Sequence, residues 1–530
     1  MPSQLTPLES IDLLVNYKII PIGPFDDQEM FALAYGPVRE YIDNLRNATK
    51  PETATHDLFR DLIRDVLKVD VGHEVSVERG AVDYMLRQEN ANPIAFELKP
   101  LFYFDRDKLT LDADPVIWKN HSEQIQKYLR SNEYVILTDL KNAHLFNRMA
   151  LIDYKPFETL PFTDLVNRFA LSENMWDSLR RIEDQTVKVD LDKSFFEDLK
   201  KWYDALDKIA FVIEDGLSKK ELIVLLLNKI IFIKTLEDYG LINFRHLIDE
   251  YDRNKDRWQP KGSVKILDNF FKEIEKFFEE YYNTELFKVH FWDYVVKTEE
   301  NAKLFLSTFE QVIGHGNWAR TMIHGMTNYN YRQIDEDIFG KAYETFIAQE
   351  KKDEGIYYTP KSITAYMAKK LVERLFGNLI DSVITALDKD NPKLEEARQI
   401  MREIEAIKII DPTSGSGSFL IKVLREIYRQ YERLAEETDW VKELEKKDLF
   451  DAPANYKQTV AFREEFLLKS NQQIQHIARL ILLHLFAVDK DERALDTAKA
   501  NLWKEAIKLR RKVYNYRKLN ISHILPNLEL

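Results

Sequence analysis

The chain has 530 residues, a length that predicts about three domains and not one continuous core. Hydrophobic residues make up 45% and charged residues 31%, as in ordinary globular proteins, and the lack of cysteine excludes disulfides, zinc–thiolate sites and thiol nucleophiles. The net charge of −13 disfavours indiscriminate binding of polyanions, although a basic groove on an acidic body would still accept DNA.

Residues 71–100 are predicted to form adjacent strands. Apolar and polar residues alternate there, and Asn-Pro turn residues precede the last of three segments, at 75–77, 82–86 and 94–98. Glu97 and Lys99 share one face of a strand, and Asp83 on the neighbouring strand can lie beside them. Carboxylates suit Mg²⁺, which would activate a water against a scissile phosphate while Lys99 orients that water. Asp83 and Glu97 are therefore the predicted metal ligands.

This arrangement resembles the core of PD-(D/E)xK nucleases, although Val82 stands where that family usually has proline. A helix predicted at about 57–67 precedes the strands, and Asp57 would supply the helical acid of the family. Gln124 and Tyr128 match the QxxxY element of restriction nucleases in this superfamily, with strands expected at 134–138 and 143–146. The resemblance implies an α/β nuclease domain over residues 1–160, with Gln124 and Tyr128 in its catalytic site. The alternative is a chance match, because Glu-x-Lys occurs in many strands.

Residues 161–337 are predicted to be an all-helical connector. Long amphipathic runs such as 195–213 and 264–282 have helical periodicity, and Gly240 is a typical helix C-cap. The most apolar stretch, 222–233, is interrupted by polar residues and is too short to span a bilayer. No basic and apolar leader opens the chain, so we expect a cytoplasmic protein without membrane contact. His315 and His324 have no acidic or histidine partner at ligand spacing, which predicts ordinary polar or core residues.

The run from Asp411 to Gly417, DPTSGSG, predicts a cofactor site. An apolar segment typical of a buried strand precedes it, and a helical pattern follows. Glycines let the backbone approach a ligand closely, and a helix N-terminus presents free N–H donors. A second apolar segment ends in Asp489, whose carboxylate is placed to accept hydrogen bonds from ribose hydroxyls. A plain Rossmann turn for some other nucleotide is the alternative.

Together with GIYYTP at 355–360, these segments resemble the S-adenosylmethionine site of gamma-type DNA adenine-N6 methyltransferases. In that family GxYYTP, DPxxGSGxFL and a ribose-binding acid occur in this order. The resemblance implies the start of a Rossmann-like methyltransferase sheet, in a domain spanning residues 338–530. It also implies cofactor contacts from Tyr358, Thr359, Pro360, Asp411, Thr413, Gly415, Gly417 and Asp489.

The part of this family's site that handles the target base has no counterpart in the sequence. Adenine methyltransferases hold the flipped base with an (N/D)PP(Y/F) loop, and this chain contains no Pro-Pro dipeptide. A sheet that stops after two strands exposes an apolar edge. We therefore expect a C-terminal continuation or a partner chain to carry this loop and the target-recognition domain.

As a whole, the α/β multi-domain chain resembles the N-terminal portion of type IIG-like restriction-modification enzymes, which fuse a nuclease to an adenine methyltransferase. The resemblance implies double-stranded DNA as substrate, with Mg²⁺ and S-adenosylmethionine as cofactors. Two alternatives fit the same motifs: a phage-defence methyltransferase with an inactive nuclease-like domain, and a non-catalytic, cofactor-sensing DNA-binding subunit. A basic and aromatic run at 503–518 fits either DNA contact or a solvated helix face.

Overall fold

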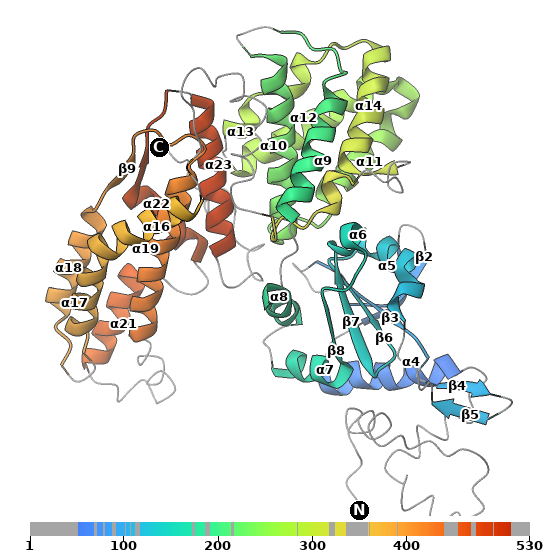
Figure 1. The fold of residues 1–530 in the computed structure, drawn as a ribbon, viewed down its shortest axis with the longest axis horizontal. Helices are drawn as coiled ribbons and strands as arrows, with labels where there is room; N and C mark the ends of the chain where they lie inside the picture. Colours follow the sequence, from blue (N-terminus) through green and yellow to red (C-terminus); the bar gives the residue numbers. More distant parts are fainter. Residues whose placement is uncertain are drawn as a thin grey trace, which may run out of the picture. The chain divides into compact units, whose positions relative to one another are not determined.

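The computed structural model, whose helices and strands are labelled in Figure 1, divides into two compact units. One comprises residues 1–190, 243–245 and 327–330, and the other 191–242, 246–326 and 331–530. The structure describes residues 51–67, 71–77, 80–86, 92–100, 102–105, 108–111, 117–171, 175–185, 191–213, 217–282, 285–316, 324–334, 359, 361–388, 391–438, 454–467, 473–490 and 492–509.

The first unit is built on a six-stranded mixed sheet with the order β1-β2-β3-β6-β7-β8. Only β3 and β6 pair in parallel, and the other neighbours are antiparallel. The strands are β1 (Val71–Val77), β2 (Gly80–Leu86), β3 (Ile94–Leu98), β6 (Tyr134–Thr138), β7 (Asn142–Asn147) and β8 (Glu158–Pro161). A separate hairpin, which the sequence did not predict, is formed by β4 (Phe102–Asp105) and β5 (Lys108–Leu111).

Helices cover both faces of this sheet, which is why every residue of β3 and β6 is buried. On one face, Phe59 of α4 packs against Tyr84, Phe96 and Phe162. On the other face, Ile125 and Leu129 of α5 pack with Ala95, Val135 and their neighbours. The helices are α4 (Pro51–Leu62), which continues as a π-turn to Leu67, α5 (Ser122–Leu129), α6 (Ala150–Asp153), α7 (Phe162–Leu171) and α8 (Met175–Gln185).

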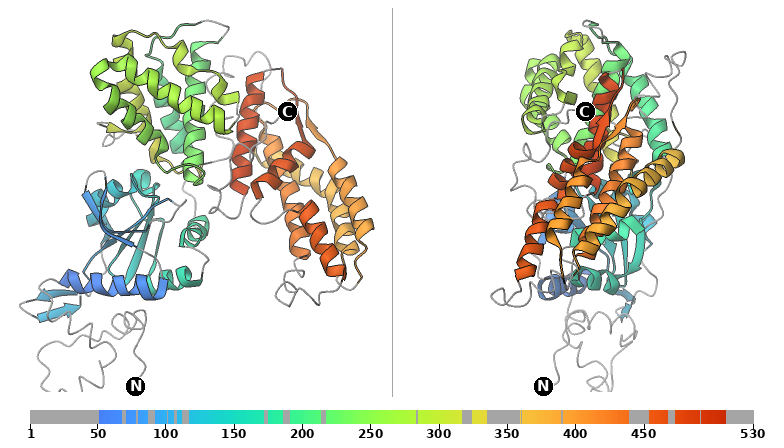
Figure 2. Two further views of the ribbon diagram at one scale, coloured as in Figure 1. Left: turned by 180° about the vertical axis from the view of Figure 1, so that it is seen from behind. Right: turned by 90° about the vertical axis from the view of Figure 1, so that its left-hand side faces the viewer.

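The second unit opens with an all-helical segment (Figure 2). Its helices are α9 (Leu191–Leu206), α10 (Lys219–Asp238), α11 (His246–Trp258), α12 (Ser263–Tyr282), α13 (Glu285–Lys288) and α14 (Glu299–Ile313). Ser218 and Glu221 form a capping box at the start of α10, and Gly240 adopts a positive φ of 66° after its end, as the sequence predicted.

Two expectations for this segment need correction. The helix predicted over 195–213 ends at Leu206, because Ala210 exchanges hydrogen bonds with the Asn301 side chain and Val212 N–H donates to Tyr294 C=O. The histidines also have acidic partners from distant helices. His315 lies 2.7 Å from Asp252, and His324 lies 3.3 Å from Asp198.

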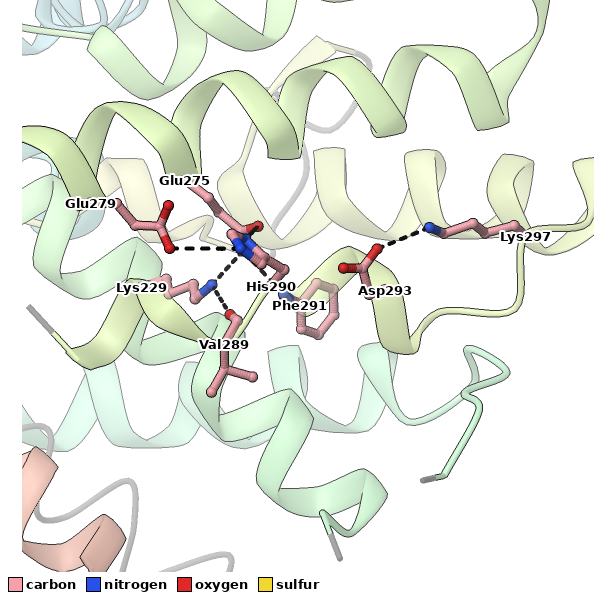
Figure 3. A network of polar contacts seen from close by, with 8 residues as sticks. All are labelled: Lys229, Glu275, Glu279, Val289, His290, Phe291, Asp293 and Lys297. Carbon is pink, nitrogen blue, oxygen red and sulfur yellow. Dashed lines mark hydrogen bonds and ion pairs between the residues drawn. The ribbon is translucent and has the colours of Figure 1, made fainter. Parts of the chain in front are cut away.

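Charged residues in the middle of the apolar helix α10 are buried as pairs. Lys229 and Glu275 of α12 are each 3% exposed and form an ion pair (Figure 3). Lys229 also donates to the C=O of Val289 at 2.6 Å, while Glu275 accepts from Phe291 N–H at 3.1 Å and faces His290 at 3.2 Å. Burial lowers the pKa of Lys229, and the charge of Glu275 opposes that shift.

The remaining part of the second unit contains two short parallel strands, β9 (Ile409–Asp411) and β10 (Leu485–Ala487), and β9 is not buried throughout as predicted, since Ile410 is 60% exposed. Its helices are α16 (Lys361–Val372), which continues as a π-turn to Gly377, α17 (Asn378–Ala386), α18 (Leu394–Ala406), α19 (Ser418–Glu437), α21 (Ala454–Phe466), α22 (Gln473–His484) and α23 (Glu492–Leu509). The predicted order of strand, glycine loop, helix, second strand is therefore confirmed. Among the described residues, no helix combines the length and apolarity needed to cross a bilayer.

The basic and aromatic run at 503–518 is only partly described. Trp503 and Lys504 belong to α23 and are 4% and 1% exposed, so at these positions neither a solvated face nor a DNA-facing patch is correct. The rest of the run beyond Leu509 lies outside the described residues.

Candidate functional sites

The first candidate site lies where β3 meets α5. Glu97 lies in β3, and Lys99 directly follows the end of this strand. Gln124 and Tyr128 are four residues apart and therefore share one face of α5. Glu97 Oε1 accepts hydrogen bonds from Lys99 Nζ at 2.7 Å and from Gln124 Nε2 at 2.6 Å. Gln124 Nε2 is also 2.8 Å from the Tyr128 hydroxyl. These four side chains thus form one connected cluster.

Backbone contacts fix the edges of this cluster. The Tyr128 hydroxyl donates to the C=O of Ala81 at 2.7 Å, which ties α5 to β2. Asp83 Oδ2 accepts from the N–H of Leu98 at 2.7 Å, so this carboxylate lies beside Glu97 while one oxygen holds β3. All five residues predicted for the nuclease site are brought together. Asp57 is not among them, because it pairs with Arg60 on α4, whose Phe59 packs on the opposite face of the sheet.

The electrostatics of the cluster disfavour a charged Glu97 in the free protein. Glu97 is 4% exposed, and its burial, reinforced by the charge of Asp83, raises its pKa against the opposing effects of Lys99 and Gln124. Burial also raises the pKa of Tyr128 to about 12, which keeps the hydroxyl protonated. His121, which the sequence did not single out, lies beside Gln124, and its pKa is lowered by burial and then by Lys99.

A divalent cation fits this arrangement. Glu97 Oε2 is buried and has no hydrogen-bond partner among the described residues, and the Asp83 carboxylate is its neighbour. Within the described residues no group of three or more histidine and acidic side chains gathers at one point. The protein would therefore offer two carboxylates and leave other positions to water or main-chain oxygen, as Mg²⁺ commonly prefers.

The second candidate site is the loop between β9 and α19. Gly415 and Gly417 have φ values of 52° and 82°, in the left-handed region that favours glycine. A Cβ on Gly417 would come within 2.9 Å of the Ala498 Cβ of α23, so only glycine fits there. A Cβ on Gly415 would meet no atom within 4 Å, so the loop is open on this side and a ligand can approach its backbone.

Two carboxylates flank this loop at the carboxyl ends of the parallel strands. Asp489, after β10, accepts a hydrogen bond from the N–H of Gly415 at 2.8 Å, so it supports the loop directly. Asp411, at the end of β9, accepts from the N–H of Thr413 at 3.2 Å. Burial raises the pKa of Asp411 and the nearby charge of Asp489 raises it further. A positively charged ligand would be stabilised here, and S-adenosylmethionine carries a sulfonium and an ammonium group.

Helix α23 contributes residues that the sequence analysis missed. Asn501 is fully buried and donates from Nδ2 to the C=O of Ser416 at 2.8 Å. Glu505 forms two hydrogen bonds with Arg425 of α19, at 2.6 and 2.8 Å. Ala498, Asn501 and Glu505 are three and four residues apart, so they lie on one face of the helix. This spacing is the sequence signal from which polar contacts on that face could have been predicted.

The GIYYTP segment is described only in part. Thr359 is exposed, whereas Tyr358 and Pro360 lie outside the described residues. Helix α16 begins directly after this segment and packs along α19, the helix that follows the glycine loop. Thr413 is exposed in the loop itself.

Comparison with known proteins places the glycine loop within a segment that matches a known family. Residues 334–449, which include the glycine loop, match the family model described as N-6 DNA Methylase. In an alignment 344 residues long that covers 54% of the chain, the sequence is 26% identical to a protein of Methanocaldococcus jannaschii named as a type II restriction enzyme and methyltransferase. Over 131 residues, 24% of the chain, it is 30% identical to DNA methyltransferase A of Bacillus subtilis.

These matches cover only part of the relatives, 25% of the first and 14% of the second. Among solved structures, the DrdV–DNA complex determined by cryoEM is similar over 89% of this chain and 38% of that one, at 14% identity and a TM-score of 0.25. A score this low does not establish a shared fold. The chain thus has a segment that matches the N-6 DNA Methylase family model and a relative named as a restriction enzyme and methyltransferase.

Proposed function

We propose that this chain is part of a restriction-modification enzyme that acts on double-stranded DNA. In this proposal residues 338–530 bind S-adenosylmethionine for methylation of adenine N6, residues 1–160 form a Mg²⁺-dependent endonuclease, and residues 161–337 connect them. The observation that carries it is the open glycine loop between β9 and α19, flanked by Asp411 and Asp489, inside and next to the segment that matches N-6 DNA Methylase.

In the methyltransferase domain the chain's own residues bind and orient the cofactor, which supplies an electrophilic methyl group when bound. Gly415 and Gly417 admit its close approach, and the N–H groups that begin α19 offer donors. Asp411 would pair with its amino-acid end and Asp489 with its ribose, while Tyr358, Thr359, Pro360 and Thr413 line it. A C-terminal continuation or partner chain would supply the (N/D)PP(Y/F) loop and the target-recognition domain.

In the nuclease domain, Asp83 and Glu97 would hold Mg²⁺, which lowers the pKa of a bound water and stabilises charge on phosphate. Lys99 lies 2.7 Å from Glu97, where its ammonium can orient a water or offset charge on the phosphate. Gln124 fixes the Glu97 carboxylate, and Tyr128 fixes Gln124 through its bond to Ala81. These two act as positioning residues.

Two assays test the proposal. Calorimetric titration of the chain with S-adenosylmethionine should show binding that Asp489→Ala weakens. Supercoiled DNA should be nicked in Mg²⁺ but not in EDTA, and Lys99→Ala should abolish nicking. A wild-type chain that does not nick DNA in Mg²⁺, with cofactor binding and methylation unchanged in Lys99→Ala, would point to an inactive nuclease-like domain. Cofactor binding without methylation, even when a chain that carries the (N/D)PP(Y/F) loop and the target-recognition domain is supplied, would point to a cofactor-sensing DNA-binding subunit.

A further inference from the structure

A basic cluster surrounds one tryptophan where α11 ends and α12 begins. Lys261 Nζ lies 4.9 Å, Arg257 Cζ 5.0 Å and Lys265 Nζ 5.7 Å from the centre of the Trp258 ring. Cations within about 6 Å of an indole ring are attracted to its face. We call these four residues the Trp258 cluster. Its three cations share one ring, although like charges repel each other.

Most of this positive charge is not neutralised by the protein. Within the described residues, Arg257 and Lys261 are exposed and form no ion pair, and Lys265 has only a 3.4 Å contact with Asp268. The nearby Glu299 carboxylate is engaged by the N–H groups of Ser263 and Val264 at the start of α12. The negative end of the α11 dipole explains a cation at Arg257, but not the approach of Lys265 from the next helix.

The composition makes this arrangement unusual for the chain. The chain has 89 acidic and 76 basic residues, so there are enough carboxylates to pair with every cation. Other lysines in this helical segment form such ion pairs. Lys297 provides the contrast. It lies 5.9 Å from the ring of Trp292, but it pairs with Asp293 at 3.1 Å and that ring is buried. Lys297 therefore contacts an indole ring, as the cations of the Trp258 cluster do, but its positive charge is neutralised by Asp293.

We infer that the Trp258 cluster binds the phosphodiester backbone of double-stranded DNA, an inference that rests on the proposed function. Phosphate oxygens would relieve the repulsion among the three cations, and the rigid indole holds them in place for contact. Contacts of this kind are independent of DNA sequence, and each neutralised phosphate releases counterions. The connector thus takes part in holding the substrate in addition to joining two domains.

The test measures binding of the full chain to a short duplex of arbitrary sequence over a range of salt concentrations. Replacing Arg257, Lys261 and Lys265 by alanine should reduce the slope of log K against log salt by about two to three, close to 0.9 per phosphate contact. Lys297→Ala is the matched control and should leave the slope unchanged. Thermal midpoints and S-adenosylmethionine binding show that the variants are folded.

The possible results distinguish a failure of the proposed function from a failure of this inference alone. A wild-type chain that binds no duplex at low salt contradicts both the proposed function and this inference. A triple variant that binds DNA with the wild-type slope, or a Lys297→Ala protein that loses as much, overturns the inference alone. If polyglutamate displaces the duplex as well as competing DNA of equal charge does, the cluster recognises acidic protein and the assignment to DNA is wrong.

Discussion

At the scale of single residues, Glu97 is the clearest case of a side chain in an environment that opposes its charge. Its pKa is raised in the folded state, first by burial and then by Asp83. The folded protein therefore binds this proton more tightly than the unfolded chain does. The corresponding stability is present below the ordinary glutamate pKa of about 4.3 and is lost as the pH rises through the raised pKa.

We therefore predict that Glu97→Gln stabilises the first unit at neutral pH while abolishing Mg²⁺-dependent cleavage. The midpoint of thermal unfolding should rise by a few degrees, at about 2–4 °C per kcal/mol for a domain of this size. Mg²⁺ should raise the midpoint of the wild type and leave that of the variant unchanged. Calorimetry at neutral pH, with and without Mg²⁺, measures both effects. A variant that melts below the wild type would contradict the argument.

A second residue-scale prediction concerns Asn501, a positioning residue for the cofactor loop. Asn501→Ala removes the hydrogen bond from this side chain to the Ser416 carbonyl, and the loss of one such bond costs about 0.5–1.5 kcal/mol. If the loop bears about 1.4 kcal/mol of this, S-adenosylmethionine affinity falls about tenfold. Lys499→Ala, on the same helix, is the control. Calorimetric titration with S-adenosylmethionine measures this change. Equal affinities for wild type and Asn501→Ala would show that Asn501 does not position the loop.

At the scale of elements, the buried pair of Lys229 and Glu275 joins α10 to α12 in the connector. Glu275→Ala leaves the Lys229 ammonium in an apolar interior with only the Val289 carbonyl and without its acidic partner, and breaking such a pair costs about 3–5 kcal/mol. Replacing both residues, Lys229→Met with Glu275→Leu, should cost much less than the single change, because no uncompensated charge remains. Urea unfolding of both variants measures this non-additivity. Equal losses would show that Lys229 finds another partner.

The same elements show what sequence patterns can and cannot predict. β2, β3, β6, β9 and α19 were predicted because alternation, buried apolar runs and glycine turns are local properties. The end of α9 at Leu206 was missed, since it depends on Asn301, which is 91 residues away from Ala210. The gathering of Glu97, Lys99, Gln124 and Tyr128 was anticipated through family resemblance. Asn501 was missed because its partner is a main-chain carbonyl, which no sequence pattern marks.

At the scale of the whole molecule, the two candidate sites lie in different compact units, and each unit has its own buried core. We therefore expect substitutions in the two sites to have additive effects on the free energy, as independent sites usually do. The chain also carries a net charge of −13, so the proposed binding to DNA would depend on local basic surface and would fall steeply as the salt concentration rises.

From this separation we predict that the two activities can be removed independently. Lys99→Ala should abolish cleavage and leave S-adenosylmethionine affinity within about twofold of the wild type, while Asp489→Ala should do the reverse. The double variant should show both losses and no additional change in its thermal midpoint beyond their sum. If Asp489→Ala also stops cleavage although Mg²⁺ still raises its midpoint, then the cofactor controls the nuclease. The two units would in that case be coupled energetically, and the methyltransferase domain would act as a sensor for DNA cleavage.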